Sequence, residues 1–275
     1  MIVVTGATGN VGSVVVRRLA ERGVSARALT RDASRAVMPS GVDVVEGDLT
    51  RPESLRPAWD DAESLFLLTT GNEDVAAILE SARQAGIEHV VLVSSLLAQT
   101  HPDSPIGRGA LRGERAVRDS GMSWTILRAW EFSSNAVWWA PSIRDHGTVR
   151  ATGVDAASPV IDPADIAAVA AAALTERGHE GRIHALTGPA EVTVRERVRI
   201  LGRVLDRDLV LEEMNAAEAL ENLKRFMPEE VVEPVIGTDS GEDRGPGVLS
   251  TVESVTGAPA RTFHQWALDH TGAFR

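Results

Sequence analysis

The sequence predicts an α/β protein with a doubly wound parallel sheet and a smaller mixed α/β cap toward its C-terminus. Two observations predict this fold. Apolar strand-like runs alternate with segments of helical periodicity through the first half of the chain, and the first run leads directly into a glycine-rich loop and a helix. We expect residues 1–132 to form the sheet domain, with sheet contributions from 160–186, and residues 133–275 to form the cap.

The strand-like runs are short and apolar on both faces, which suits a sheet that helices cover on each side. In chain order they are residues 2–5, 25–29, 42–46, 64–68, 89–93, 125–127 and 182–186. The segments with helical periodicity are 11–22, 74–85, 111–120, 162–175, 194–205 and 262–270. Gly86 and Gly121 stand where two of these helices should end, because glycine readily adopts the left-handed conformation of a helix terminus.

Composition excludes several classes of function. The 275 residues carry a formal net charge of −11, which argues against nonspecific binding of nucleic acid. No stretch is long and apolar enough to span a bilayer, and the apolar run 2–4 has no basic leader of a signal peptide. The absence of cysteine excludes disulfides and thiolate catalysis. We therefore expect a soluble cytoplasmic protein without nucleic-acid or membrane partners.

Much of the negative charge lies in residues 212–243, which hold ten acidic side chains. We interpret this segment as a solvated helical face, with binding of a partner as the alternative. The glycine- and aspartate-rich residues 237–247 that overlap its end are expected to form a loop.

The most specific motif is the loop Thr5–Gly12, which lies between the first strand and the first helix. Its glycines allow a tight turn and a close approach of the backbone to a pyrophosphate, whose charge the free amides and the helix dipole stabilise. The alternative is a glycine-rich turn without a ligand. We expect cofactor contacts from Gly6, Thr8, Gly9, Asn10, Val11 and Gly12.

Arg31 follows the second strand, where proteins that bind NAD place an acid on the ribose 2′-hydroxyl. A guanidinium at this point can pair with a 2′-phosphate, and Arg35 one turn later can join it. The sequence therefore favours NADP(H) over NAD(H). In the alternative, Arg31 is a surface charge and Asp32 binds the ribose.

Two further loops follow strands at the same expected edge of the sheet. Asp48 and Leu49 come after the third strand, and Thr69, Thr70 and Gly71 come after the fourth. Ligands of open α/β sheets bind at the carboxyl ends of the strands, so we expect adenine and ribose contacts here. The same residue types are equally common in ordinary turns.

Several segments together resemble the NmrA-like family of atypical short-chain dehydrogenases/reductases. They are the loop Thr5–Gly12, Arg31, Gly47-Asp48-Leu49, Val93-Ser94-Ser95 and Thr125-Ile126-Leu127-Arg128. In the C-terminal half, residues 178–181, 185–189 and 261–263 resemble the family's NADPH-quinone reductase and azoreductase-like branch. The resemblance implies a Rossmann domain, an NADP(H) cofactor that Ser94 and Arg128 also contact, and a substrate bound by the C-terminal half.

The chain departs from the short-chain dehydrogenases at their catalytic pair. By analogy, a Tyr-x-x-x-Lys motif would fall near Ile106 and Ala110, yet the sequence contains no tyrosine. It therefore cannot use a phenol as the proton donor for carbonyl reduction. A quinone-like or conjugated aromatic carbonyl acceptor delocalises the negative charge, so positioning can suffice. The alternatives are an NADP(H)-sensing regulator and a redox-neutral isomerase or epimerase.

Three side chains are candidates for a proton donor or acceptor near the substrate. Ser95 lies just beyond the fifth strand, where family members place a hydroxyl near the nicotinamide, but it also suits a strand-end turn. His101 lies in the segment that replaces the start of the catalytic helix, where a histidine is more often exposed. Glu131 is either a desolvated proton acceptor or a salt-bridge partner.

Aromatic residues concentrate in residues 130–139 and are expected to bind a flat aromatic or quinone-like substrate. The predicted set is Trp130, Phe132, Asn135, Trp138 and Trp139. Core packing and a homodimer surface are the competing interpretations. The seven histidines include no i, i+4 pair within a helix, so we predict no metal site.

Overall fold

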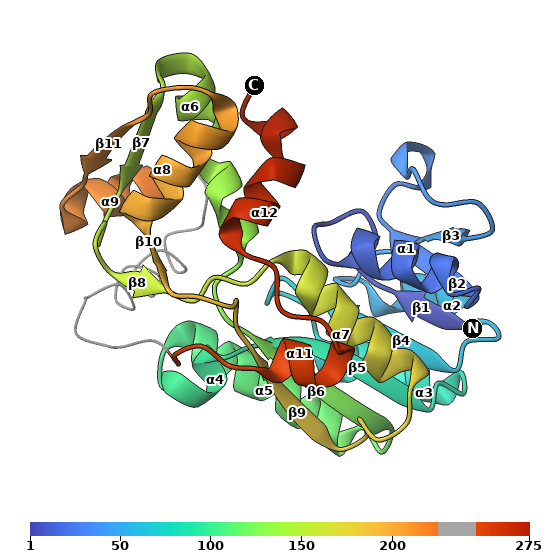
Figure 1. Cartoon of the computed structure of the whole chain (residues 1–275). Helices are drawn as coiled ribbons and strands as arrows, with labels where there is room; N and C mark the ends of the chain where they lie inside the picture. The colour runs from blue at the N-terminus through green and yellow to red at the C-terminus, as the bar shows by residue number, and fades with distance from the viewer. Residues whose placement is uncertain (225–245) are drawn as a thin grey trace. The chain divides into compact units, whose positions relative to one another are not determined.

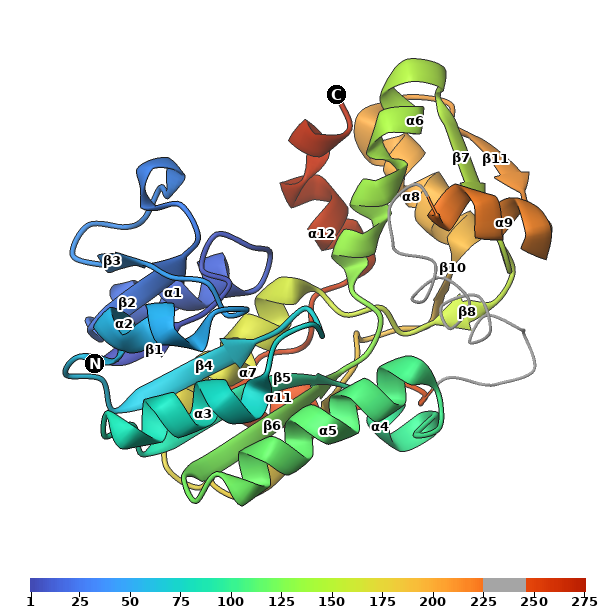
Figure 2. The ribbon, with the colours of Figure 1, turned by 180° about the vertical axis from the view of Figure 1, so that it is seen from behind.

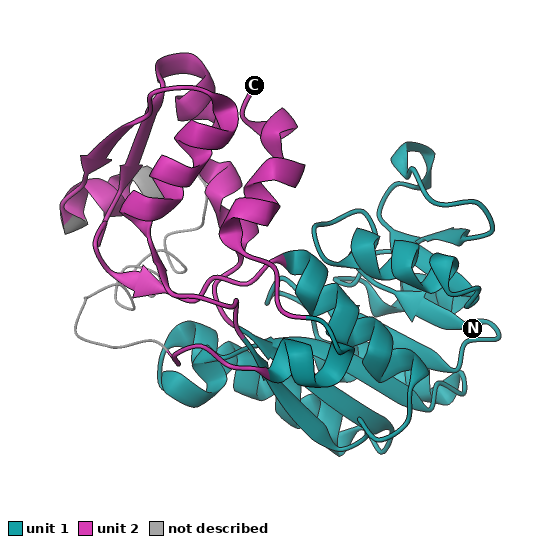
Figure 3. Ribbon diagram, viewed as in Figure 1, with its two compact units in different colours: residues 1–129, 163–186, 251–258 teal, residues 130–162, 187–250, 259–275 magenta. Residues whose placement is uncertain are grey.

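The computed structural model describes residues 1–224 and 246–275, which form two compact units (Figures 1 and 3). Unit 1 comprises 1–129, 163–186 and 251–258, and unit 2 takes the described residues of 130–162, 187–250 and 259–275. The sequence placed 251–258 in the cap. In the structure this segment forms α11 (Thr251–Thr256), which packs against helix α7 (Pro163–Thr175) and strand β9 (Arg182–Leu186) of unit 1.

Unit 1 is built on a seven-stranded parallel sheet with the order β3-β2-β1-β4-β5-β6-β9. Its remaining strands are β1 (Ile2–Val4), β2 (Ala26–Thr30), β3 (Asp43–Glu46), β4 (Ser64–Leu68), β5 (His89–Ser95) and β6 (Ser123–Ala129). The chain builds outward from β1 to β3, then returns to place β4 on the other side of β1. This doubly wound arrangement confirms the predicted fold class and puts the switch point between β1 and β4.

Helices cover both faces of this sheet (Figures 1 and 2). α7 and α11 lie on one face with α1 (Gly12–Glu21), and the other carries α2 (Arg56–Trp59), α3 (Val75–Gln84) and α5 (Pro105–Asp119). Alternate strand residues supply the two cores. Leu65 and Leu67 pack in a cluster with Trp59, whereas Phe66 between them is buried on the opposite face. The predicted helix stops are confirmed, because Gly86 and Gly121 follow α3 and α5 with positive φ.

Helix α5 begins six residues earlier than the periodicity indicated. Ser104 caps it by accepting a hydrogen bond from the Gly107 amide at 3.0 Å, and Pro105 occupies its first turn. These are standard helix-start signals. The glycines and arginines of residues 107–113 concealed the apolar stripe on which the prediction relied.

Unit 2 is a mixed α/β unit. Its helical elements are η3 (Ser133–Trp139), α6 (Ala140–His146), α8 (Val194–Leu205), α9 (Ala216–Leu223), α12 (Phe263–Asp269) and η4 (Thr271–Ala273). The parallel pair β7 (Thr148–Ala151) and β11 (Val210–Glu213) and the antiparallel pair β8 (Ala157–Ser158) and β10 (Val192–Thr193) complete it. Ile143, Leu201, Phe263 and Trp266 form the centre of its core.

The predicted acidic helical face is only partly present. Glu212 and Glu213 lie on strand β11 instead of a helix, because residues 210–213 pair with β7. Glu218 and Glu221 lie on α9 as expected. The acidic residues 229–243 and most of the predicted loop 237–247 lie outside the described residues. No helix in the described part of the chain is long and apolar enough to cross a bilayer.

Candidate functional site

The glycine loop lies at the carboxyl edge of the sheet, between β1 and α1. The Thr5 hydroxyl ties it to β4 by donating to the Leu68 carbonyl at 3.2 Å and accepting from the Leu68 amide at 2.8 Å. Gly6 has a φ of +58°, which glycine adopts without strain, and its carbonyl accepts from the Gly9 amide at 2.8 Å. The loop is therefore a tight turn fixed to the switch point of the sheet.

Gly12 is the position where loop and helix approach most closely. A Cβ atom there would lie 2.2 Å from the Gly6 carbonyl oxygen and 2.8 Å from that of Thr5. Only glycine fits such a contact. Gly12 therefore allows the loop to fold back over the start of α1.

The start of α1 is suited to bind an anion. Val11 stands at the N-cap without a side-chain cap, and within the described chain the amides of Asn10, Val11 and Gly12 have no hydrogen-bond acceptor. Gly6, Thr8, Gly9 and Asn10 are exposed. Bare amides and the positive end of the helix dipole stabilise a phosphate at such a place. The loop therefore fits the pyrophosphate of a dinucleotide.

Arg31, Asp32 and Arg35, the predicted ligands of the ribose or its 2′-phosphate, lie just after β2. One oxygen of Asp32 is engaged, because Oδ1 accepts from the Ser34 amide at 3.0 Å and from the Ser34 hydroxyl at 2.6 Å. These bonds cap the short helix η1 (Ala33–Arg35). Arg31 and Arg35 are both exposed, and neither forms a salt bridge in the described part of the chain.

The loop after β3 lies near Arg31. Asp48 accepts from the amide and hydroxyl of Thr50 at 2.9 and 2.8 Å, and these bonds are the main reason that its pKa lies below the ordinary value. The charges of Arg51 and Arg31 lower the pKa further, which places Arg31 and Asp48 in one electrostatic neighbourhood. Leu49 packs against the core beside α2 and α3.

Glu73 organises the loop after β4, a role that the sequence pattern did not reveal. Its carboxylate accepts from the Thr70 amide, from the Thr70 hydroxyl at 2.8 Å and from the Gly71 amide at 2.8 Å. Burial would raise the pKa of Glu73, but these hydrogen bonds outweigh it and the pKa is lowered. Thr70 and Gly71 are thus held by the protein, whereas Thr69 is half-buried at the end of the strand. The sequence feature that could have indicated this role is the carboxylate three residues after Thr70, a spacing that allows it to cap the turn.

Ser94 and Arg128 meet at a fully buried carboxylate, that of Glu114 on α5. The Ser94 hydroxyl donates to Glu114 Oε1 at 2.8 Å, and Arg128 forms a fork with bonds of 2.8 and 2.7 Å. Arg118 adds a third donor at 2.8 Å. Ser94 and Arg128 therefore join β5 and β6 to α5 through the buried Glu114, and their contact with the cofactor remains a prediction.

The candidate proton donors of unit 1 are Ser95, the last residue of β5, and His101, which follows the next helix. Ser95 ends the strand, is half-buried, and accepts from the Leu97 amide at 3.2 Å, as in the strand-end turn that the sequence left open. His101 caps the C-terminus of α4 (Leu97–Thr100), with its Nδ1 2.9 Å from the Thr100 hydroxyl. A catalytic role for either residue remains a prediction.

Glu131 of unit 2 is a salt-bridge partner, which was one of its two predicted roles. Its Oε1 accepts from Nη1 of Arg197 on α8, and its Oε2 accepts from the Ser158 hydroxyl at 2.7 Å. The same hydroxyl accepts from the Trp130 indole at 3.0 Å. No local pattern indicated Arg197, because this partner lies 66 residues away in the chain.

The predicted substrate residues occupy η3 and the segment before it. Trp139 is half-buried against the core of unit 2, with the Arg197 guanidinium 5.8 Å from its ring centre. Trp138 is 48% exposed. Phe132 is half-buried and forms an isolated bridge with Ile161, and its carbonyl accepts from the Asn135 amide. Trp139 thus packs partly against the core, all four aromatic side chains keep some exposed surface, and contact with a substrate remains a prediction.

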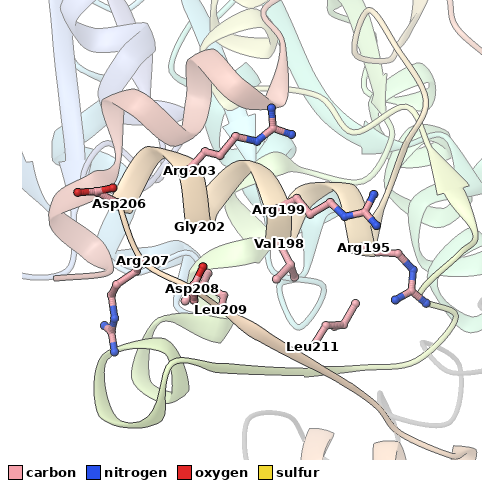
Figure 4. A pocket seen from close by; sticks show the side chains of 10 residues that line it. All are labelled: Arg195, Val198, Arg199, Gly202, Arg203, Asp206, Arg207, Asp208, Leu209 and Leu211. Carbon is pink, nitrogen blue, oxygen red and sulfur yellow. The ribbon is translucent and has the colours of Figure 1, made fainter.

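A pocket of about 660 Å³ lies under α8 in unit 2 and contains none of the predicted site residues (Figure 4). Val198 of α8 and Leu209 and Leu211 of the following segment supply its apolar lining, and the other side chains that line it are mostly charged. Arg195 at its edge is already paired with Asp155. Among the described residues there is no cluster of three or more histidine, aspartate or glutamate side chains that could hold a metal.

Comparisons with known proteins identify the family of the chain. A family model described as NAD(P)H-binding matches residues 6–177. The chain is 41% identical to a (4-alkanoyl-5-oxo-2,5-dihydrofuran-3-yl)methyl phosphate reductase of Streptomyces griseus, over 100% of this chain and 99% of the relative. It is 35% identical to an NAD(P)H azoreductase of Xenophilus azovorans, over 100% and 99%.

The fold has close counterparts among solved structures. The NADPH-dependent quinone oxidoreductase QOR2 of Escherichia coli superposes with a TM-score of 0.79 and 25% identity, covering 99% of this chain and 100% of that one. A triphenylmethane reductase of Citrobacter in complex with NADP(H) has a TM-score of 0.80 and 22% identity, covering 98% and 99%. The chain therefore belongs to the NAD(P)H-binding family, in its NmrA-like atypical short-chain dehydrogenase/reductase branch, and is an NAD(P)H-dependent oxidoreductase.

Proposed function

We propose that the protein is an NADPH-dependent reductase of conjugated carbonyl compounds, with a quinone or an unsaturated lactone as the acceptor. One observation carries this choice of acceptor. The chain keeps the complete dinucleotide loop but has no tyrosine anywhere, so the phenol that protonates a simple ketone is missing.

The cofactor contacts in this proposal come from unit 1. The amides at the start of α1 bind the pyrophosphate, and Gly6 and Gly9 allow it to approach. Arg31 pairs with the 2′-phosphate, helped by Arg35, because Asp32 is engaged with Ser34. When bound, NADPH supplies the hydride. The loops at 48–49 and 69–71 enclose the adenosine half.

The protein's own contribution to the reaction is mainly to position the acceptor against the cofactor and to donate a hydrogen bond to its carbonyl oxygen. In a conjugated acceptor the negative charge that hydride addition creates spreads onto the carbonyl oxygen, and a proton from water completes the reduction. Ser95 is the best-placed donor to that oxygen, because its hydroxyl accepts from the Leu97 amide and keeps its own proton to donate. His101 is the second candidate. Glu131 has no proton-transfer role in the proposal, since Arg197 and Ser158 engage both of its oxygens.

The substrate class is supported by the chemistry of the relatives and by unit 2. The Streptomyces griseus relative is named for a dihydrofuranone with an alkanoyl group and a phosphate, the Xenophilus azovorans relative for azo compounds, and an Escherichia coli relative for quinones. All are conjugated acceptors. We assign contact with a flat acceptor to the indole and phenyl faces of Trp130, Phe132, Trp138 and Trp139, and a polar contact to the amide of Asn135.

The test is consumption of NADPH by the purified protein with a panel of acceptors. We expect turnover with naphthoquinones and alkanoyl butenolides and none with a saturated ketone, because only conjugation delocalises the charge. Turnover of the saturated ketone at a comparable rate would contradict the proposal. Binding of both NADPH and NADP⁺ without turnover of any acceptor would identify a sensor, and substrate change without net NADPH consumption would identify an isomerase or epimerase.

A further inference from the structure

A continuous chain of polar contacts links two of the tryptophans in unit 2. The Trp130 indole donates to the Ser158 hydroxyl at 3.0 Å, and Ser158 donates to Glu131 at 2.7 Å. Arg197 pairs with the other oxygen of Glu131, and its guanidinium lies over the ring of Trp139 at 5.8 Å. One arginine is therefore connected to both indoles, to Trp139 directly and to Trp130 through two side chains.

Arg197 occupies a position where helix α8 otherwise places apolar side chains. The buried residues of this helix are Val194, Arg197, Val198 and Leu201, which form its inward face. The arginine is only 5% exposed, and its Nε is buried without a hydrogen-bond partner. Burying a guanidinium is costly unless a carboxylate compensates it. The pair with Glu131 is what makes this position tolerable for a charge.

We propose that Arg197 is a positioning residue for the acceptor: it fixes Glu131 and the two indoles, and it cancels the charge of Glu131 beside them. This inference rests on the proposed function. It has two parts. Without Arg197 the indole of Trp130 loses its fixed orientation, because Ser158 and Glu131 are free to turn. The carboxylate of Glu131, which is next to Trp130 in the chain, then also repels an acceptor that carries negative charge.

The charge of the acceptor distinguishes this role from a merely structural one. We would compare a neutral naphthoquinone with its sulfonate in Arg197→Gln. The expected result is a KM that rises about tenfold or more for the sulfonate and clearly less for the neutral quinone, with the KM for NADPH unchanged. Adding Glu131→Gln to this variant should bring the KM for the sulfonate back toward that for the neutral quinone, because the uncompensated carboxylate is gone. The part of the KM increase that comes from the lost indole orientation affects both quinones and should remain in the double variant.

Arg195→Gln is the matched control. Arg195 lies two residues earlier on α8 and forms a salt bridge with Asp155 at 2.7 Å, but its side chain is 41% exposed, and among the described residues the arginine that lies over Trp139 is Arg197. Its KM values should equal those of the wild type. Equal effects of Arg197→Gln on the neutral and the anionic quinone, without recovery in the double variant, would overturn the proposal.

Folding is checked separately, because loss of a buried arginine can unfold the protein. Thermal melting identifies such a failure, and Glu131→Gln alone then provides the test, since it removes the charge and keeps Arg197. It should lower the KM for the sulfonate relative to that for the neutral quinone, and an unchanged ratio would reject the charge role.

Quenching of tryptophan fluorescence by each quinone without NADPH measures binding independently of turnover. A wild type that binds neither quinone would reject the proposed function itself.

Discussion

Gly12 shows how one residue can decide whether the cofactor loop exists. Helix propensity alone would favour alanine at this first position of α1. An alanine Cβ, however, would lie 2.2 Å from the Gly6 carbonyl oxygen. That oxygen belongs to the backbone, so it cannot move away as a flexible side chain could. We expect Gly12→Ala to weaken NADPH binding about tenfold or more and to cost about 1–3 kcal/mol of stability, as overpacking does. Calorimetric titration with NADPH and urea unfolding measure the two effects.

Gly113→Ala is the control for this prediction. Gly113 lies within α5, and a Cβ at this position would meet nothing closer than a leucine methyl at 3.9 Å. The substitution should leave NADPH affinity unchanged and should stabilise the helix slightly. An affinity of Gly12→Ala equal to that of the wild type would mean that the loop does not bind the pyrophosphate as we describe.

Arg31 is the residue on which the choice between NADPH and NADH depends. A charge-assisted hydrogen bond to a phosphate contributes about 1.5–3 kcal/mol, so Arg31→Glu should lower the affinity for NADPH by roughly ten- to a hundredfold. The affinity for NADH, which has no 2′-phosphate, should change little. Titrations with both nucleotides measure this. Equal losses for the two would remove the case for 2′-phosphate recognition, and Arg35→Glu tests whether the second arginine contributes.

Among elements, β5, β6 and α5 are joined at the buried carboxylate of Glu114. Burial would raise the pKa of Glu114, but hydrogen bonds from Arg128, Ser94 and Arg118 outweigh it and lower the pKa below the ordinary 4.5. Glu114→Gln leaves the arginines without their carboxylate and should cost about 3–5 kcal/mol at neutral pH. Glu80→Gln, which breaks an exposed pair with Arg83 on α3, should change the free energy of unfolding far less.

The pH dependence of this difference has a definite sign. The folded-state pKa of Glu114 is lowered, so its contribution is complete above pH 4.5 and is lost as the pH falls through the folded-state pKa. The gap in unfolding free energy between wild type and Glu114→Gln should therefore narrow on acidification. Urea unfolding at neutral pH and below pH 4.5 measures it, and a gap that stays constant would show that Glu114 is not the stabilising anion.

At the scale of elements, the sequence predicted what depends on local pattern and missed what depends on distant partners. The strand 64–68 and the helix 194–205 have the predicted bounds because their apolar periodicity is strong. Glu212 and Glu213 were predicted on a helical face but lie on the strand at 210–213, since only its pairing with β7 makes this segment a strand. The glycine loop was recognisable from its glycine spacing together with its place between the first strand and the first helix. Glu114 and Arg197 were not assigned their structural roles, because each acts through contacts that folding brings together. Glu73 was missed although its partners Thr70 and Gly71 lie within three residues, because a carboxylate in a loop does not by itself indicate this contact.

At the scale of the whole molecule, the two units are interleaved along the chain, which passes from one to the other after residues 129, 162, 186, 250 and 258. The sheet of unit 1 is therefore incomplete within residues 1–132. Its edge strand β9 and the helix α7 come later, and α7 is buried almost all round, with Ile166, Val169 and Leu174 among its buried side chains. A helix of this kind covers sheet that would otherwise meet water.

This interleaving predicts that residues 1–132 do not form an autonomous cofactor domain, even though they contain the entire glycine loop and Arg31. Expressed alone, the fragment should lack cooperative thermal unfolding and should not bind NADPH, because the face that α1 shares with α7 is exposed. A second fragment, 1–186, restores α7 and β9 in one chain, and we expect it to recover part of the sheet's stability and measurable NADPH binding. Circular dichroism melts and calorimetric titration of both fragments test this. Wild-type affinity in 1–132 would show that the first six strands suffice.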